Sequence, residues 1–434
     1  MRIGIIGAGM TGLTAAYHLS NQGHEVTIFE HAPFAGGHAS TFEVQGGILE
    51  RGYHHLFTSD TDIQELVASL GLPSLIEWMP SSVGIYAKGA IYKLNSPLDL
   101  LKLSPLKFIN RLRLGFVLKY LQLQKNWRKY EQVTAARWLR NKLGKQAYEM
   151  LWEPLLLGKF GATLYDKVPM SWIWGKLNTR VKSRETGASG ELLGYPSGSF
   201  AVILDKLLEI LDKNQVKIHL STPVHKIENH NNTMTITLQD TQQQFDKILS
   251  TVSNDILLNL VPQLQSHPEY IEKLNSISYL SAVVEILILE KPISDVYWLN
   301  IADAKFPFLG VIEHTNLISA ENYNGKHIVY ITNYVSTDHP IFKMDERKLL
   351  ETYIPFVKLI NPDFNESWII ETFNFKIGRA QPVMGVNYSH NIPEHASPVK
   401  NLYVANTAQI YPEDRGTNYA VRMGKYVAEQ IMRT

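Results

Sequence analysis

The chain has 434 residues, with 42 lysines and arginines against 41 aspartates and glutamates, so its formal net charge of +1 excludes a strongly basic nucleic-acid binder. A content of 45% hydrophobic and 19% charged residues is that of an ordinary globular protein, and this length favours two domains or one domain with a large insertion. The sequence has no cysteine, which excludes disulfides, thiolate metal sites and cysteine nucleophiles.

The first residues predict a nucleotide-binding turn. Arg2–Ile6 is typical of a short buried strand, a G-x-G-x-x-G motif follows it directly, and Leu13–Leu19 is helical in character. In such a motif Gly7 permits the tight turn, Gly9 lets the backbone approach a pyrophosphate, and Gly12 allows the helix to pack closely on the strand. The helix N-terminus adds free N–H groups for an anion.

A second strand, Glu25–Phe29, follows the helix and ends in Glu30, which lies 21 residues beyond Gly9. A carboxylate at this place accepts hydrogen bonds from the ribose hydroxyls of a dinucleotide. Because strand, helix, second strand and acid are all in order, the motif favours dinucleotide binding over a simple glycine-rich turn.

The residues after Glu30 do not continue with another crossover helix. They give Gly36-Gly37, then Ser40-Thr41, and then a hairpin over Thr41–Glu50 with Gly46-Gly47 at its turn. This order resembles the extended FAD fingerprint of the superfamily of flavin-containing amine oxidases, protoporphyrinogen oxidases and phytoene desaturases. The resemblance implies FAD as the cofactor. It implies cofactor contacts from Gly36, Gly37, His38 and Ser40, although position 38 is commonly arginine in that family.

The segment Glu50–His55 follows the hairpin, at the place where these relatives bring a glycine past the flavin ring. The resemblance implies cofactor contacts from Gly52 and His54. His54 is also a candidate catalytic residue that could polarise the substrate, while the alternative is that Tyr53 and His55 pack beneath the ring. We expect no metal site, because adjacent side chains on a strand point to opposite faces and the other histidines are dispersed.

The segment from Ile76 to Ser189 is predicted to be largely helical, with helices over Pro97–Leu101 and Leu106–Trp127. Between Leu100 and Tyr130 it has eight basic residues and no acid. Two interpretations stay open: a basic amphipathic surface that lies on anionic lipid, or a solvated helix face. Because no signal-peptide pattern precedes the first strand, and no apolar run of about 18 residues is present, we expect a cytoplasmic protein, with contact to a membrane surface as the open alternative.

The middle of the chain again resembles the family. Tyr195–Phe200 is similar to the turn before the family's adenine-side strand, and Leu204–Leu211 to the helix that follows it. Val216–Leu220 with Thr222–Val224 resembles the strand that meets adenine, which implies a cofactor contact from Val224. Phe245–Thr251 is expected as its returning partner strand.

Strands over Ile277–Leu289 and His327–Tyr334 are expected to form a sheet over the flavin. Leu151–Gly161 and Tyr297–Asn316 resemble a protoporphyrinogen-oxidase-like branch of the family. Arg379, just before the last motif, is the second candidate catalytic residue, because a guanidinium suits an anionic group of the substrate.

The C-terminal end resembles the closing motif of the family. Asn401–Ala405 is typical of a buried strand, and Gly416–Gly424 opens a terminal helix. Such a helix N-terminus would stabilise negative charge on the pyrimidine edge of the flavin. The resemblance implies cofactor contacts from Thr407, Gly416 and Asn418. Many relatives have a carboxylate where this chain has Asn406-Thr407.

Together these patterns predict an α/β fold in which a discontinuous Rossmann-like FAD-binding domain (1–75, 190–265 and 396–434) carries an inserted α+β substrate domain (76–189 and 266–395). We expect an FAD-dependent oxidoreductase that moves a hydride from an amine, a porphyrinogen or a polyene to flavin N5. The alternatives are a non-redox flavoenzyme resembling UDP-galactopyranose mutase and a catalytically silent FAD-binding module. The expected partner is a small molecule and not a nucleic acid, and no oligomeric state is indicated.

Overall fold

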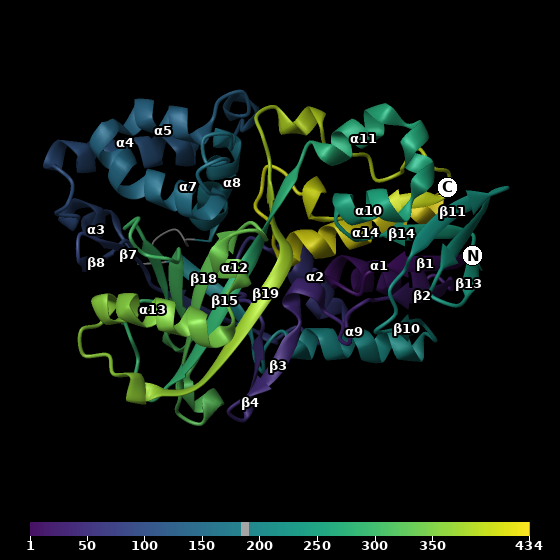
Figure 1. Ribbon diagram of the computed structural model, residues 1–434, viewed down its shortest axis with the longest axis horizontal. Helices are drawn as coiled ribbons and strands as arrows, with labels where there is room; N and C mark the ends of the chain where they lie inside the picture. The colour runs from purple at the N-terminus through teal and green to yellow at the C-terminus, as the bar shows by residue number, and fades with distance from the viewer. Residues whose placement is uncertain (184–190, 434) are drawn as a thin grey trace.

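A parallel sheet forms the end of the molecule that holds both termini (Figure 1). The structure, a computed structural model, describes residues 1–183 and 191–433. The sheet has the strand order β10-β2-β1-β14-β20. Its strands are β1 (Arg2–Ile6), β2 (Glu25–Phe29), β10 (Lys217–His219), β14 (Lys247–Ser250) and β20 (Leu402–Val404). The apolar residues of β1 and β2 are buried, as expected for strands covered on both faces.

Helices cover this sheet and connect its strands. They are α1 (Met10–Ser20), α2 (Thr61–Ser69), α9 (Ala201–Lys213), α10 (Asn254–Leu260), α11 (Pro268–Asn275) and α14 (Thr417–Arg433). The crossover helix α1 packs against both α9 and α14. Its approach to α14 depends on Gly424, since a Cβ there would lie 2.6 Å from the carbonyl oxygen of Thr11. The predicted α/β fold with a Rossmann-like sheet is confirmed.

The second large sheet is mixed and has seven strands in the order β19-β15-β18-β17-β16-β7-β8. Its strands are β7 (Val83–Ala87), β8 (Ala90–Lys93), β15 (Ser278–Leu289), β16 (Trp298–Ile301), β17 (Gly310–Glu313), β18 (His327–Val335) and β19 (Ile369–Val383). Alternate residues of β15 face opposite cores: Val283 and Leu287 pack with α13 (Glu346–Ile360), while Val284 and Ile286 join the core shared with the parallel sheet. The predicted strands over Ile277–Leu289 and His327–Tyr334 are therefore confirmed, as neighbours in one sheet.

Helices form the part of the molecule farthest from the termini (Figure 1). They are α3 (Pro97–Lys102), α4 (Phe108–Leu123), α5 (Ala135–Leu143), α6 (Lys145–Ala147), a π-helical turn (Tyr148–Trp152), α7 (Glu153–Phe160) and α8 (Met170–Lys182). The short α12 (Pro340–Lys343) lies beside the mixed sheet. Among the described residues, the structure offers no helix with the length and apolar character that a bilayer crossing would need.

Three small sheets complete the fold. They contain β3 (Thr41–Val44) with β4 (Gly47–Glu50), β5 (Leu56–Phe57) with β9 (Glu191–Pro196) and β6 (Ile76–Ser81), and β11 (Lys226–His230) with β12 (Thr233–Thr237) and β13 (Gln242–Phe245). The hairpin over Thr41–Glu50 is as predicted. The predicted domain boundary between residues 189 and 190 lies outside the described residues, and the other boundaries stay predictions.

One strand prediction was wrong. Phe245–Thr251 is not the partner of Val216–Leu220, because Phe245 ends β13 and β14 lies between β1 and β20, separated from β10 by both β2 and β1. The apolar pair Ile248 and Leu249, both fully buried, takes β14 into the middle of the parallel sheet, where both of its faces are covered. Val224 also lies in the segment between β10 and β11 and not in a strand.

Candidate functional site

The turn between β1 and α1 requires its glycines. Gly7 has φ +105°, which disfavours other residues, and its N–H donates to the carbonyl of Phe29 at 2.8 Å. A side chain on Gly12 would overlap the carbonyl of Gly7, so α1 starts directly against the turn. Gly9 is the N-cap of α1 and has no side chain to cap it. The first N–H groups of α1 are thus directed toward a site for an anion.

Glu30 lies at the carboxyl end of β2 beside this turn. Its carboxylate accepts hydrogen bonds from the backbone N–H groups of Ala8 at 2.8 Å and Ala32 at 2.9 Å, and His31 Nδ1 lies 2.7 Å away. The backbone of Thr222 donates to the Glu30 carbonyl at 2.8 Å, which brings the segment before Val224 to the same place. Glu30 is therefore fixed between the glycine turn and the chain after β10.

The second glycine pair lies against the first. Gly36 donates to the carbonyl of Ala8 at 2.8 Å and forms a parallel bridge with Gly9, while a Cβ on Gly37 would lie 3.0 Å from the Gly9 Cα. Both residues have positive φ, +102° and +57°. Two segments of backbone without side chains thus meet at the N-terminus of α1. These residues fit the pyrophosphate of a dinucleotide, which needs close backbone approach.

The other predicted cofactor residues lie after the second glycine pair, after β20 and around the start of α14. Ser40 is buried in the loop after Gly37, and Thr407 begins a 3-10 turn after β20. Gly416 precedes α14 directly, but the Asn418 side chain accepts a hydrogen bond from the Ile63 N–H at 3.0 Å and thereby holds α14 to α2. These residues stay predicted contacts of a cofactor.

Asn406 does not present its amide to a cofactor. The amide donates to the Val252 carbonyl at 2.8 Å and to Asn254 Oδ1 at 2.9 Å, and it accepts from the N–H of Ala408 at 3.0 Å. The side chain at the position of the family's carboxylate therefore ties β20 to the segment after β14.

Gly52, His54 and His38 lie together beside Arg415. His54 Nδ1 is 2.6 Å from the carbonyl oxygen of Gly52. Burial lowers the pKa of His54 to about 4. The hydrogen bond with the Gly52 carbonyl opposes this change, and the charge of Arg415 lowers the pKa further. His38 keeps exposed surface, yet desolvation, Arg415 and His54 also lower the pKa of His38. Both rings are therefore neutral at pH 7 and suit hydrogen bonding more than charge stabilisation.

His55 points to different partners. Its Nδ1 is 3.0 Å from the hydroxyl of Tyr297, and burial followed by the charge of Arg180 lowers the pKa of His55 to about 3. Tyr53 stacks edge-on against Trp298, with ring centroids 5.0 Å apart. The two neighbours of His54 therefore pack against residues of the mixed sheet, and whether they also lie beneath the flavin ring stays a prediction.

Arg379 lies apart from this group. It has φ +53° in a bulge of β19, and its Nε is 2.5 Å from Oδ2 of Asp255, at the start of α10. The side chains of both residues are about half exposed. Its guanidinium is therefore already paired, and a catalytic role for Arg379 stays a prediction.

Charged residues gather around Asp414. Of these, the sequence alone offers only Arg415, one of three arginines with Arg379 and Arg422 that could hold a diphosphate in the mutase-like alternative. Oδ2 of Asp414 lies 3.3 Å from Nζ of Lys159 and 3.0 Å from Nζ of Lys176. Its Oδ1 accepts from Gln381 at 3.4 Å and from the backbone N–H of Arg415 at 3.1 Å. We call Lys159, Lys176, Asp414 and Arg415 the Asp414 cluster. Its members come from α7, α8 and the loop before α14, so no local sequence pattern reveals it.

Aromatic rings connect the Asp414 cluster to Gly52. Nη2 of Arg415 donates to the Tyr334 hydroxyl at 2.7 Å, and this hydroxyl is 3.1 Å from that of Tyr53. Nζ of Lys159 lies 4.9 Å from the centre of the Tyr334 ring and 5.0 Å from that of Trp172. The cluster therefore adjoins both the segment before α14 and the segment predicted to pass the flavin.

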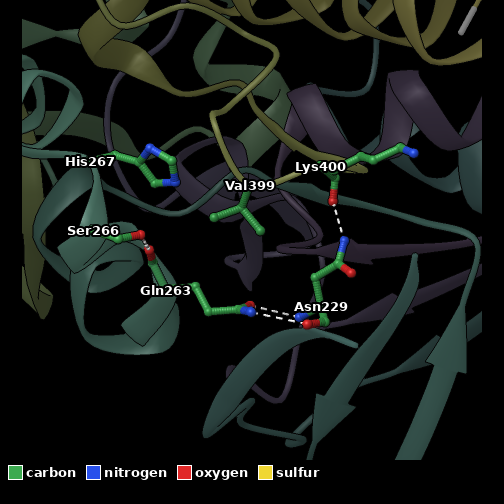
Figure 2. A pocket seen from close by; sticks show the side chains of 6 residues that line it. All are labelled: Asn229, Gln263, Ser266, His267, Val399 and Lys400. Carbon is green, nitrogen blue, oxygen red and sulfur yellow. Dashed lines mark hydrogen bonds between the residues drawn. The ribbon is translucent and has the colours of Figure 1, made fainter. Parts of the chain in front are cut away.

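Figure 2 shows a separate pocket, lined by residues of β11, of the turn before α11 and of the chain before β20. Its lining residues are Asn229, Gln263, Ser266, His267, Val399 and Lys400. The polar groups there bind one another: the Asn229 amide donates to the Lys400 carbonyl at 2.6 Å, and its backbone pairs with the Gln263 side chain. This pocket contains none of the predicted site residues.

Comparison with known proteins identifies the family of this chain. Residues 10–432 match the family model of flavin-containing amine oxidoreductases. The chain belongs to this family. The family is one of flavin-containing oxidoreductases, and the resemblance predicted from the glycine motifs is confirmed.

Its relatives act in different reactions. Coproporphyrinogen III oxidase of Staphylococcus aureus is 28% identical over 299 residues, which cover 59% of this chain and 61% of that enzyme, less than two thirds of its length. A putative protoporphyrinogen oxidase from Exiguobacterium sp. 255-15 has a similar structure, with a TM-score of 0.78, 17% identity and coverage of 100% and 99%. Reduced UDP-galactopyranose mutase also gives a TM-score of 0.78, at 16% identity and coverage of 100% and 95%. The two structures show the shared fold alone.

Proposed function

We propose that this enzyme binds FAD along the two glycine segments and oxidises an organic small molecule beside the Asp414 cluster. The carrying observation is the contact between Gly9 and Gly37 at the uncapped start of α1, with Glu30 fixed next to it. In this proposal the glycines hold the pyrophosphate and Glu30 the ribose, while Val224 lies at the adenine end. Ser40 and His38 lie beside the second glycine pair.

The flavin end of the site is proposed to lie between Gly52–His54 and the start of α14. When bound, FAD accepts a hydride at N5 from a substrate carbon. The N–H groups after Gly416 would hold the ring edge that gains negative charge, and the helix dipole of α14 would stabilise that charge. Neutral His54 donates from Nδ1 to the Gly52 carbonyl, so its Nε2 would accept a hydrogen bond near the ring.

The substrate classes that remain are amines, porphyrinogens and polyenes. A second candidate function is a non-redox reaction like that of the mutase, favoured by the cations of the Asp414 cluster, which suit a diphosphate. An anaerobic absorbance spectrum of the purified protein tests both. We expect an oxidised-flavin band that one donor among an amine, a polyene and a porphyrinogen bleaches. A band that only dithionite bleaches would favour the mutase or a silent flavin module, and no band after addition of FAD would overturn the proposal.

We also propose that the enzyme lies on an anionic membrane surface through α3 and α4. Large apolar side chains are exposed along both helices, among them Phe116 at 75% and Ile109 at 67%. On α4 the exposed residues Ile109, Phe116, Tyr120 and Leu123 follow one another at intervals of seven, four and three, which places them on one face. The buried Leu114 and Leu121 occupy the opposite face.

The same region supplies the charge that an anionic surface requires. The eight basic residues between Leu100 and Tyr130, with no acid among them, belong to the same segment as the exposed apolar row. Apolar side chains enter the headgroup region while lysines and arginines bind lipid phosphates, which is the behaviour of a surface-bound amphipathic helix. We expect the enzyme to sediment with vesicles that contain phosphatidylglycerol. Failure to sediment at low salt would leave α4 as a solvated face.

A further inference from the structure

The Asp414 cluster has more positive than negative charge. Lys159 and Lys176 share the carboxylate of Asp414, Arg415 follows it directly, and both oxygens of Asp414 already accept hydrogen bonds. The Lys159 and Asp414 side chains are only 15% and 18% exposed. Cations that are shielded from water require an opposite charge nearby. The carboxylate of Asp414 has one negative charge, which balances only one of the three cations.

Arg415 has no carboxylate partner among the described residues. Its Nε donates to the carbonyl of Ala380 and its Nη2 to the hydroxyl of Tyr334, and both of these acceptors are neutral. A guanidinium has five N–H groups, so donors of Arg415 remain for a further acceptor. Carboxylates and phosphates are the anions that the planar guanidinium of arginine binds best.

The packing of α8 that brings the cluster together requires a glycine in that helix. Gly175 precedes Lys176 on α8, and a Cβ there would lie 2.5 Å from the carbonyl oxygen of Pro412. Only a glycine lets α8 lie this close to the loop that carries Asp414. The rings of Trp172 and Tyr334 flank Lys159 and exclude water from one side of it. These features indicate a site with a fixed geometry and not a chance group of surface charges.

We propose that Lys159, Lys176 and Arg415 bind an acidic group of the substrate, a carboxylate or a phosphate, next to the flavin. The inference rests on the proposed function, because it takes the flavin to lie along Gly52 and the start of α14. Asp414 then holds the two lysines in place and keeps the site from excessive positive charge when no substrate is bound. A neutral amine or an unsubstituted polyene would leave these cations without a partner.

The test is a calorimetric titration of the flavin-loaded protein with inorganic phosphate and, separately, with succinate at constant ionic strength. We expect saturable binding of at least one anion. Lys176→Gln should weaken it at least tenfold, while the protein still folds, since the Lys176 side chain is 35% exposed and the pair of Lys159 with Asp414 stays intact. Lys425→Gln is the matched control, because Lys425 lies on α14 and pairs with exposed Glu65 at 3.5 Å.

The arms of the titration separate the outcomes. Tighter binding of phosphate assigns a phosphate-bearing substrate, and tighter binding of succinate assigns a carboxylate. Absence of binding, equal affinity in wild type and Lys176→Gln, or binding only after removal of the flavin would each overturn the inference, the last because the cluster would then belong to the cofactor. Full flavin content in the same samples shows that such a failure leaves the proposed function intact.

Discussion

The molecule has two groups of basic residues that differ in what surrounds them. On α3 and α4 the lysines and arginines are mostly exposed and stand beside exposed apolar side chains. In the Asp414 cluster two lysines share one buried carboxylate, with aromatic rings around Lys159. The first group can exchange its partners with solvent and salt, whereas the second cannot. The difference indicates that one group binds a large and mobile anionic surface and the other a single acidic group of fixed position.

Removal of the shared carboxylate should have the largest effect. Asp414→Asn removes the carboxylate that opposes the effect of burial on Lys159 and pairs with Lys176, so we expect the free energy of unfolding to fall by about 3 kcal/mol, as for other ion pairs shielded from water that lose one partner. Chemical denaturation measures this loss. The cations hold the pKa of Asp414 well below its usual range, so its contribution to stability is present at neutral pH and is lost only in strong acid.

Glu65→Gln on α2 provides the control for this substitution. Glu65 pairs with Lys425 at 3.5 Å, and both side chains are about half exposed. An exposed pair contributes about 0.2 to 1 kcal/mol, so the variant should unfold almost as the wild type does. If Asp414→Asn and Glu65→Gln lowered the free energy of unfolding equally, water would screen the Asp414 cluster. The two groups of basic residues would then not differ in their exposure to solvent.

The two groups also show what a sequence can and cannot predict. The glycine turn, Glu30 and Gly36-Gly37 fall within 31 consecutive residues, from Gly7 to Gly37, so their spacing alone predicts their proximity. The basic run on α4 is visible for the same reason. Its apolar row was not assigned to an exposed face, because periodicity does not show which face of a helix is buried.

The Asp414 cluster could not be predicted in this way. Lys159 and Asp414 are 255 positions apart and meet only because α7 packs on the mixed sheet and the last loop returns across it. The error in Phe245–Thr251 has a similar origin, since a short apolar strand fits several places in a sheet and tertiary packing selects one. Arg379 was selected by its position near the last motif, but its pairing with Asp255 depends on the fold.

Among the described residues, Glu50 is a buried carboxylate with no cation beside it, in contrast to Asp414. Glu50 is fully buried and accepts hydrogen bonds from Tyr195 and from the N–H of Phe200, yet burial raises the pKa of Glu50 to about 7. The folded state therefore binds a proton that the unfolded state releases above about pH 4.5. Its contribution to stability is full below that pH and is lost as the pH rises toward 7.

Glu50→Gln should flatten this dependence, because the amide keeps an acceptor for Phe200 and carries no charge. Unfolding free energies of the two proteins should differ more at pH 7.5 than at pH 4.5, with the variant favoured at the higher pH. Measurement by urea denaturation at both pH values checks this. The same pH slope in both proteins would show that Glu50 is not the titrating group.

The apolar row on α4 should control membrane binding without affecting stability. In the double variant Ile109→Ser/Phe116→Ser two largely exposed side chains are lost, so unfolding should change by no more than about 0.5 kcal/mol. Binding to phosphatidylglycerol vesicles should weaken at least tenfold, because each apolar side chain contributes about 1.5 to 3 kcal/mol when fully buried. Co-sedimentation measures the effect, and Leu359→Ser/Ile370→Ser, two exposed apolar residues elsewhere, is the matched control.

A single lysine of the same face should have the smallest effect. Lys119 is exposed and precedes Tyr120 of the apolar row, and its Nζ bonds only to Gln122 at 3.1 Å among the described residues. A lysine near an anionic surface contributes about 1 kcal/mol, so Lys119→Gln should weaken vesicle binding about fivefold at low salt. The effect should vanish on neutral phosphatidylcholine vesicles and at high salt, where charges on the surface are screened. Lys305→Gln, at an exposed site on the mixed sheet's side, should bind as the wild type does. If Lys119→Gln still bound vesicles more weakly than the wild type at high salt, the lysine would act by packing. The basic residues of α4 would then not differ from those around Asp414 in their exposure to salt.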